Sequence, residues 1–180
     1  LTPRDRPVFT TARAALFALL VALGLPAAPA GQDAEPYTSK EGKFKAKFPA
    51  KPDEKSQTTN GIKFTMHVAG AKEGGYVVGI ADLPIPDGET AEMTQKRLDG
   101  ARDGAIGNVK GKLIDSKDVT LDKKYPGREF SASLPQKDGL LRARIYLAGK
   151  RLYQVMVIGT KDFVGGKDAD AFLDSFKITE

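Results

Sequence analysis

The sequence predicts a domain of the α+β class, an α/β/α sandwich in which an antiparallel sheet carries a helix on each face. Most segments after Lys40 alternate between apolar and polar residues, as half-buried strands do. Two other segments have the caps and apolar spacing of helices. The strand "LYQVMVIG" has two apolar sides: Leu152, Met156 and Ile158 on one, and Tyr153, Val155 and Val157 on the other. A strand of this kind needs cover on both faces, and the two predicted helices supply it.

The first predicted strand covers residues 43–48 and alternates strictly between two kinds of side chain. In "KFKAKF", Phe44, Ala46 and Phe48 face one way and three lysines face the other. Lysines on an exposed strand face discourage unwanted pairing, so we expect this strand near a sheet edge. Pro49 then ends it.

Two longer strands, residues 61–70 and 74–84, form a hairpin. The inward residues of the first are Ile62, Phe64, Met66 and Val68. His67 is the only histidine, and the alternation puts it on the polar side with Lys63 and Thr65. We therefore expect a solvated His67 with no catalytic or metal-binding role, whose change to alanine alters stability by less than about 0.5 kcal/mol.

Two helices are predicted. Thr90 can cap a helix that runs to about Gly104, and its inward stripe is Ala91, Thr94, Leu98, Ala101 and Ala105. A closing helix at residues 167–176 has acids in its first turn, where the helix dipole favours them. Its apolar side consists of Phe172, Leu173 and Phe176. Between the two helices the strand pattern returns at residues 112–121.

Three strands joined by short turns fill residues 128–159 and carry charges among their apolar residues. If Phe130 and Ala132 share a face with Leu141 and Ala143, then Glu129 lies on the opposite face. The residues that share this second face are Ser131, Arg142, Arg144 and Tyr146. The turn in "LAGKRL" sets Leu147 opposite Leu152, which adds Tyr153 to the same face.

The candidate ligand site therefore consists of Arg142, Arg144, Tyr146, Tyr153 and Glu129. Arginine forks and tyrosine rings over an apolar floor can hold an anionic or sugar-like group. The alternative is that Glu129 only pairs with an arginine beneath the covering helix. The sequence leaves both interpretations open.

The remaining chemistry is limited. The chain contains no cysteine, which excludes disulfides, thiolate nucleophiles and cysteine metal sites, and no cofactor motif is found. Asp82, Asp87 and Glu89 flank a proline turn and keep open a hydrolase of envelope carbohydrate. A purely structural domain is a third alternative. Basic residues are scattered along the chain, so no nucleic-acid partner is expected.

The first thirty residues have the layout of a secretory signal peptide, with a basic start, the apolar run "AALFALLVALGL" and a small-residue end. We expect cleavage between Ala30 and Gly31, a linker at residues 31–39 and a single domain at residues 40–180. The mature protein would be periplasmic or extracellular, without a stable membrane span; an uncleaved anchor is the alternative. Removing three arginines and one aspartate lowers the formal charge from +5 to +3. Because the sequence starts with Leu1 rather than Met, a fragment and an unusual start codon both stay open.

The element order resembles the PsbP-like family of small exported α/β/α domains. The similarity covers roughly residues 37–179 and is carried by "KFKAKFPAKP", "YVVGIADLP" before a helix, and "AFLDSFKI". It implies a non-catalytic binding or assembly module, because the photosystem II subunit that names the family docks onto a membrane complex. No set of functional residues defines the family, so the resemblance assigns none here. The expected partner is an unknown envelope protein or an anionic or sugar-like ligand.

Overall fold

The computed structural model describes residues 35–59 and 61–179. The predicted signal peptide and its cleavage site at Ala30 and Gly31 lie outside the described residues. The end of the predicted linker is described, and it is not a linker: Tyr37–Ser39 form strand β1. This strand is ordered by its side chains, since the Tyr37 ring packs against the rings of Phe44 and Phe48.

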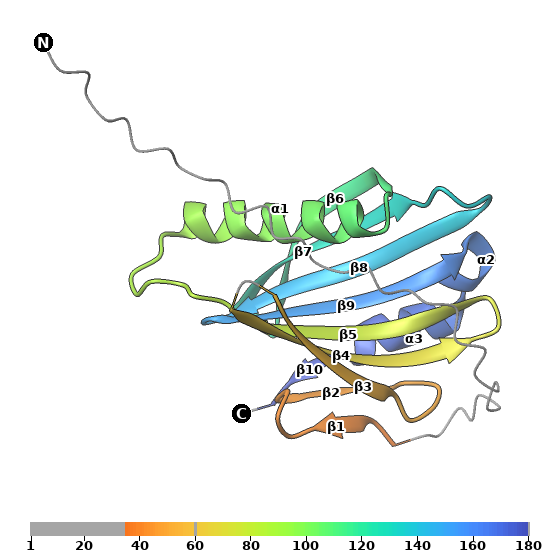
Figure 1. Ribbon diagram of the computed structural model, residues 1–180, viewed down its shortest axis with the longest axis horizontal. Helices are drawn as coiled ribbons and strands as arrows, with labels where there is room; N and C mark the ends of the chain where they lie inside the picture. Colours follow the sequence, from red (N-terminus) through yellow and green to blue (C-terminus); the bar gives the residue numbers. More distant parts are fainter. Residues whose placement is uncertain (1–34, 60, 180) are drawn as a thin grey trace, which may run out of the picture.

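The described residues form two sheets, and the larger has seven antiparallel strands in the order β3-β4-β5-β9-β8-β7-β6 (Figure 1). Their bounds are Asp53–Thr59 (β3), Ile62–Ala71 (β4), Gly74–Asp82 (β5), Lys112–Leu121 (β6), Tyr125–Ser133 (β7), Gly139–Ala148 (β8) and Arg151–Thr160 (β9). Strand β9 lies in the middle of the sheet, and β3 and β6 are its edges. Edge strand β3 was not expected from the sequence, because its segment "DEKSQTT" contains no apolar residue.

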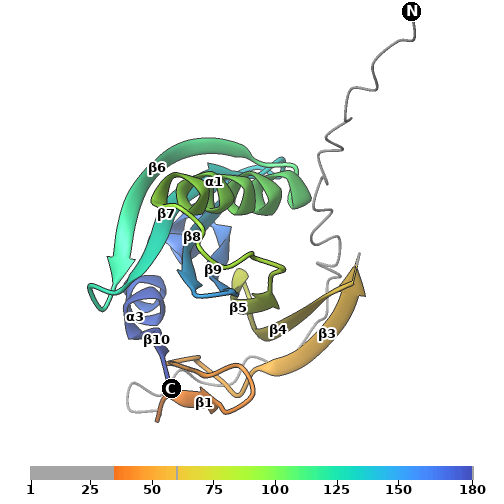
Figure 2. The same cartoon turned by 90° about the vertical axis from the view of Figure 1, so that its left-hand side faces the viewer.

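A smaller sheet has three antiparallel strands in the order β1-β2-β10. Strand β2, Phe44–Ala46, is its central strand, and β10, Lys177–Ile178, comes from the other end of the chain. The apolar residues predicted for β2 are confirmed as buried: Phe44, Ala46 and Phe48. These side chains belong to one hydrophobic cluster with residues of the larger sheet. Figure 2 shows β1 and β10 of the small sheet on the same side of the molecule as α3.

Three helices complete the described chain. Helix α1 (Ala91–Asn108) begins at the predicted cap, where the Thr90 hydroxyl accepts a hydrogen bond from the Met93 amide, and it ends beyond Gly104. Helices α2 (Lys161–Val164) and α3 (Lys167–Ser175) follow β9. The buried residues of α1 are Leu98, Ala105 and Ile106. Ala91 was predicted to belong to the inward stripe, but it is exposed, and the first buried residue of α1 is Leu98.

Strand β9 contributes to two hydrophobic clusters, as its two apolar sides predict. Leu152 belongs to the cluster that contains Leu98 of α1, and Tyr153 belongs to the cluster that contains Phe172 of α3. Neighbouring residues of a strand point to opposite faces, so the clusters lie on the two faces of the sheet. The α+β class and the antiparallel sheet are confirmed. On the α3 side, the small sheet also contributes to the cluster.

Leu98 tests the α1 side of the core. The change Leu98→Ala should lower the free energy of unfolding by about 2–5 kcal/mol, because it removes a fully buried side chain and leaves a cavity. Met93→Ala in the same helix is the control: this exposed residue should change stability by less than about 0.5 kcal/mol. Urea unfolding followed by circular dichroism measures both, and equal losses would contradict the described packing of α1.

Candidate functional site

The strand register predicted for residues 128–159 is confirmed. Glu129 pairs with Arg144 and Ser131 with Arg142 between β7 and β8. Tyr146 pairs with Tyr153 between β8 and β9, and Leu147 with Leu152. The five residues of the candidate ligand site therefore do lie on one face of the sheet, on the side covered by α3.

The polar groups of the two arginines are engaged by α3. Arg144 donates hydrogen bonds to Glu129 over 2.7 Å and to Asp174 of α3 over 2.7 Å. Arg142 donates to Asp170 of α3 over 2.8 Å and to the Val164 carbonyl at the end of α2 over 3.1 Å. The two guanidinium groups therefore hold the closing helix on the sheet.

The spacing of these four side chains explains why they meet. Residues two apart on a strand are separated by about 6.8 Å on the same face, as Arg142 and Arg144 are. Residues four apart on a helix are separated by about 6 Å along the axis, as Asp170 and Asp174 are. The match of these spacings was readable in the sequence, where the acids of the closing helix were interpreted only through the helix dipole.

Glu129 is held as a carboxylate by its cations. Burial by itself would raise the pKa of Glu129, but hydrogen bonds from Lys117 and Arg144 outweigh that effect and hold the pKa below its usual value. This carboxylate is therefore charged at neutral pH. The side chains of Arg144 and Glu129 are each about one quarter exposed or less, so the pair is only partly screened by solvent.

The two tyrosines of the candidate site lie inside the core. Tyr146 is 4% exposed, and its ring stacks on that of Phe176 with a 4° interplanar angle. Tyr153 is 1% exposed, and its hydroxyl donates to the Gly42 carbonyl over 3.0 Å. The face is thus occupied by α3 and the small sheet. Pairing beneath a covering helix, the alternative left open by the sequence, is present; a ligand-binding role for this face stays a prediction.

The acids considered for a hydrolase belong to separate ion pairs. Asp82 accepts two hydrogen bonds from Arg151, over 2.6 and 2.7 Å, and hydrogen bonding to Arg151 is the main cause of the lowered pKa of Asp82. Asp87 pairs with Lys150 over 3.0 Å. Glu89 pairs with Arg97, also over 3.0 Å. Each carboxylate has its own cation, and residues 35–59 and 61–179 contain no cluster of three metal-ligating side chains.

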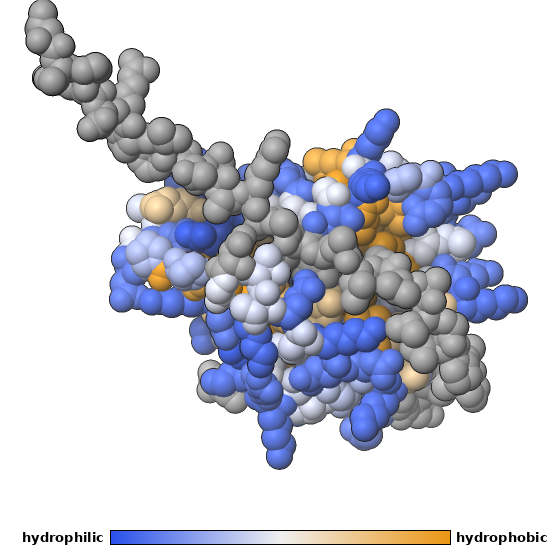
Figure 3. Space-filling model, in the orientation of Figure 1, coloured by the Kyte–Doolittle hydropathy of each residue, from blue (hydrophilic) through white to orange (hydrophobic). Residues whose placement is uncertain are grey.

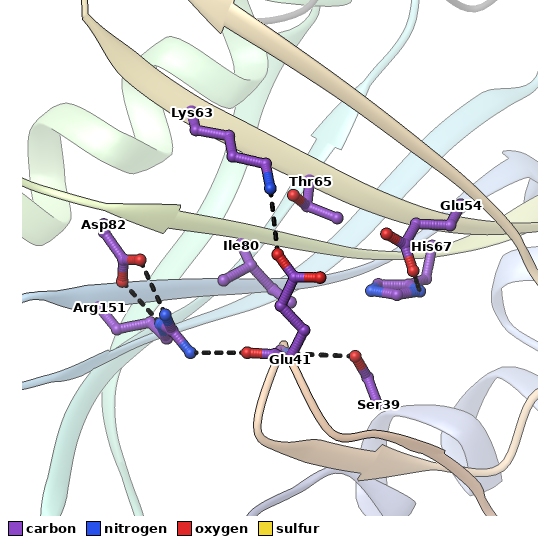
Figure 4. Close-up of a pocket in the computed structure, with 10 residues that line it drawn as sticks. Ser39, Glu41, Glu54, Lys63, Thr65, His67, Ile80, Asp82 and Arg151 are labelled. Atoms are coloured by element: carbon purple, nitrogen blue, oxygen red, sulfur yellow. Dashed lines mark hydrogen bonds and ion pairs between the residues drawn. The ribbon is translucent and has the colours of Figure 1, made fainter.

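Asp82 also lines a small polar pocket between the β1–β2 turn and strands β4 and β5 (Figure 4). Its lining residues are Ser39, Glu41, Gly42, Glu54, Lys63, Thr65, His67, Ile80, Asp82 and Arg151. Figure 4 shows Glu41 above the β1–β2 turn, with its carboxylate reaching Lys63 over 3.0 Å. Arg151 also donates to the Glu41 carbonyl over 3.0 Å, which ties the turn to β9.

The expectation that His67 is solvated is wrong. His67 is 1% exposed, and its ring packs against those of Tyr37 and Phe44. Its Nδ1 lies 3.3 Å from the Tyr37 hydroxyl and 3.7 Å from the Glu54 carboxylate, and its Nε2 has no hydrogen-bond partner. Local alternation gave the correct side of β4. That side is covered by β1 and β2, which no local pattern reveals.

The protonation of His67 is opposed by its surroundings. Burial lowers the pKa of His67 below its ordinary 6.5, because a charged imidazolium is poorly solvated there. The negative charges of Glu54 and Glu41 act in the opposite direction and do not overcome burial. His67 is therefore neutral in the folded protein near neutral pH.

A second, more open hollow lies on the other side of the β1–β2 turn. Its lining residues are Lys43, Lys124, Tyr125, Ala148, Arg151, Tyr153, Ile178 and Thr179. Arg151 lines both this hollow and the polar pocket. Lys124 stands 4.9 Å from the centre of the Tyr125 ring, within the range of a cation–π contact. The sequence did not suggest this hollow, since its residues come from five separate segments.

The arrangement of these elements supports a PsbP-like fold. Among solved structures, the chain is similar to the solution structure of cyanobacterial PsbP (CyanoP) from Synechocystis sp. PCC 6803. The TM-score is 0.55 at 12% sequence identity, over 84% of this chain and 98% of that chain. No protein-family model matches the chain, and no curated protein matches it. The likeness thus bears out the predicted resemblance at the level of the fold.

The ion pairs of the arginine face can be measured by a double-mutant cycle. Arg144→Gln should lower the free energy of unfolding by about 1–2 kcal/mol, because Glu129 and Asp174 both lose a charged partner. Together with Glu129→Gln it should show a coupling above about 0.5 kcal/mol in urea melts. The exposed pair Lys96–Glu92 is the control, with an expected coupling of about 0.3–0.5 kcal/mol. Loss of an anionic ligand without loss of stability would instead support the binding role.

Buried His67 makes stability depend on pH. The unfolded chain keeps the ordinary pKa of 6.5, so it binds more protons than the folded chain between that pH and the lowered value. The free energy of unfolding should therefore fall as pH drops below about 7, and level off below the folded pKa.

The matched variant is His67→Gln, which removes the only histidine. Urea melts between about pH 7.5 and pH 5.5 should show the decline in the unmodified protein and a flat profile in the variant. His67→Ala should now cost well above the 0.5 kcal/mol expected from the sequence, about 1–3 kcal/mol, because it empties a buried site. Identical pH profiles for the unmodified protein and His67→Gln would exclude a titrating His67.

Proposed function

We propose that this chain is an exported, non-catalytic binding or assembly module of the cell envelope, built as an α/β/α sandwich. The observation that carries the proposal is the likeness in fold to cyanobacterial PsbP, which extends over nearly all of that chain. The family resemblance noted in the sequence implies the same class of protein. The partner would be an envelope protein or a ligand with anionic or sugar-like groups.

The internal contacts favour a rigid scaffold over a reactive centre. Arg142 and Arg144 are used to hold α3, and Arg151 is used to hold Asp82 and the β1–β2 turn. Because these arginines are paired within the molecule, they fix the positions of α3 and the β1–β2 turn. A rigid structure of this kind can present a preformed surface to a partner. Among the described residues, no helix is both long enough and apolar enough to cross a membrane.

Export is tested by producing the full chain in a Gram-negative host. N-terminal sequencing of the accumulated protein should begin at Gly31, because the small residues before it form a signal-peptidase site directly after the apolar run. Osmotic shock should release the protein with periplasmic markers. An intact N-terminus in the membrane fraction would support the uncleaved anchor instead.

The module role is tested in the same cells. A chemical cross-linker that reacts with lysines, applied to intact envelopes, should give defined larger species that contain this chain. The control is the same protein without residues 1–30, kept in the cytoplasm, which should not give these species. Release of sugars from envelope polysaccharide by the purified chain, lost in Asp82→Asn, would contradict a non-catalytic module.

A further inference from the structure

The outer face of the small sheet is a row of lysines. Phe44, Ala46 and Phe48 are buried, and the lysines that alternate with them are exposed: Lys43, Lys45 and Lys47. Lys177 of β10 is exposed beside them. We call these four residues the lysine face. Lys45 is paired directly with Lys177 across β2 and β10, although residue 177 lies far away in the sequence. Lysines that look scattered in the sequence are gathered by this pairing.

The lysine face has no ion-pair partner within the part of the chain that the structure describes. The only acid between residues 40 and 51 is Glu41, and it pairs with Lys63. Like charges placed directly opposite each other on neighbouring strands destabilise a sheet. Lys45 opposite Lys177 is thus unfavourable in the free protein, and an acidic partner would relieve the repulsion.

The face continues into the open hollow through Lys43, which lines both. The lining of the hollow also includes Lys124, Arg151 and the apolar residues Ala148 and Ile178. Lys43 holds a left-handed backbone conformation (φ 51°), and so does Lys123 beside Lys124 (φ 55°). Such conformations cost about 1 kcal/mol in non-glycine residues and are frequent at binding sites. The two turns that carry these lysines are therefore held in place by the surrounding structure.

We propose that the lysine face and the adjoining hollow bind an extended acidic segment of a partner protein. Alternate residues of an extended chain are about 6.8 Å apart, so Lys45 and Lys47 match acids two positions apart in an extended segment. Lys43, in the turn before β2, lies where the lysine face meets the hollow. An apolar side chain of that segment would enter the hollow. This inference rests on the proposed function and specifies which surface serves it and what chemistry the partner has.

An anionic membrane surface fits the same charges less well. The hollow is lined by both basic and apolar residues, a combination that an acidic segment with one apolar side chain matches more fully than a layer of anionic headgroups does. The large apolar residues exposed in the described chain, Met93, Leu113 and Ile114, belong to α1 and β6 rather than to the small sheet. Figure 3 shows an apolar patch at the top of the view, where α1 meets β6. The lysine face therefore lacks the apolar side chains with which a basic surface anchors in lipid.

The test is binding of a fluorescent decapeptide with glutamate at every second position and one leucine, followed by fluorescence anisotropy. The same peptide with glutamine in place of glutamate is the control ligand. The protein without its predicted signal peptide, residues 31–180, should bind only the glutamate peptide. Its binding should be weaker at about 300 mM salt than at about 50 mM salt. The double variant Lys43→Glu and Lys45→Glu should weaken this binding about tenfold or more.

The matched control variant is Lys72→Glu and Lys137→Glu, two exposed lysines in other turns. It changes the net charge equally, so its binding should stay within about twofold if the lysine face is the site. Lys45→Glu should keep or raise the melting temperature, because a glutamate then faces Lys177. The melting temperature of the double variant is measured as well, and a retained value excludes misfolding as the cause of lost binding.

Three outcomes would overturn the proposal: no binding of the glutamate peptide, equal weakening by both double variants, or binding to phosphatidylglycerol vesicles without binding to the peptide. The envelope cross-linking experiment separates this proposal from the proposed function. If the Lys43→Glu and Lys45→Glu protein still gives the same cross-linked species, the module role stands and the lysine face is not its surface. If the unmodified protein gives none, the module role itself fails.

Discussion

The burial of β9 on both faces is the constraint on which the rest of the fold depends. A strand with apolar residues on both sides cannot lie at the surface, so the sheet needs two layers of cover. Leu98 of α1 belongs to one of the two clusters to which β9 contributes, and Phe172 of α3 belongs to the other, together with residues of the small sheet. The arrangement of charged groups follows from this, because the second layer must be held against strands that carry Arg142 and Arg144.

Those arginines show that the face of a strand can be predicted from the sequence while the element that covers it cannot. The alternation in residues 128–159 was sufficient to predict the register, since a slip by one residue would bury two arginines among apolar side chains. What lies above the face depends on where α3 packs, and that is decided by the whole core. Asp170 and Asp174 carried the necessary signal in their spacing, but only once a strand partner with the matching spacing is considered.

Other parts of the structure were beyond sequence reasoning for identifiable reasons. His67 is buried because Tyr37 and Phe44 cover it, and this cover depends on a pairing of short strands with little local pattern. Strand β3 has no apolar residue to indicate it, since an edge strand with two exposed sides needs none. The hollow beside Lys43 joins turns and strand ends that are adjacent only in space. The alternation of apolar and polar residues predicts the side of a strand on which a residue lies. It does not predict which element packs against that side.

The small sheet also links the two ends of the domain. Strand β2 binds β1 on one side and β10 on the other, so residues 44 and 178 lie in one ladder although nearly the whole domain separates them in the chain. Closing so long a loop costs entropy that only the rest of the fold can offset, and contacts of this kind slow folding. The pairing of β2 with β10 therefore needs both ends of the domain. A chain that ends before Lys177 would lack β10, the third strand of this sheet. The complete lysine face is therefore present only once the whole domain has been synthesised.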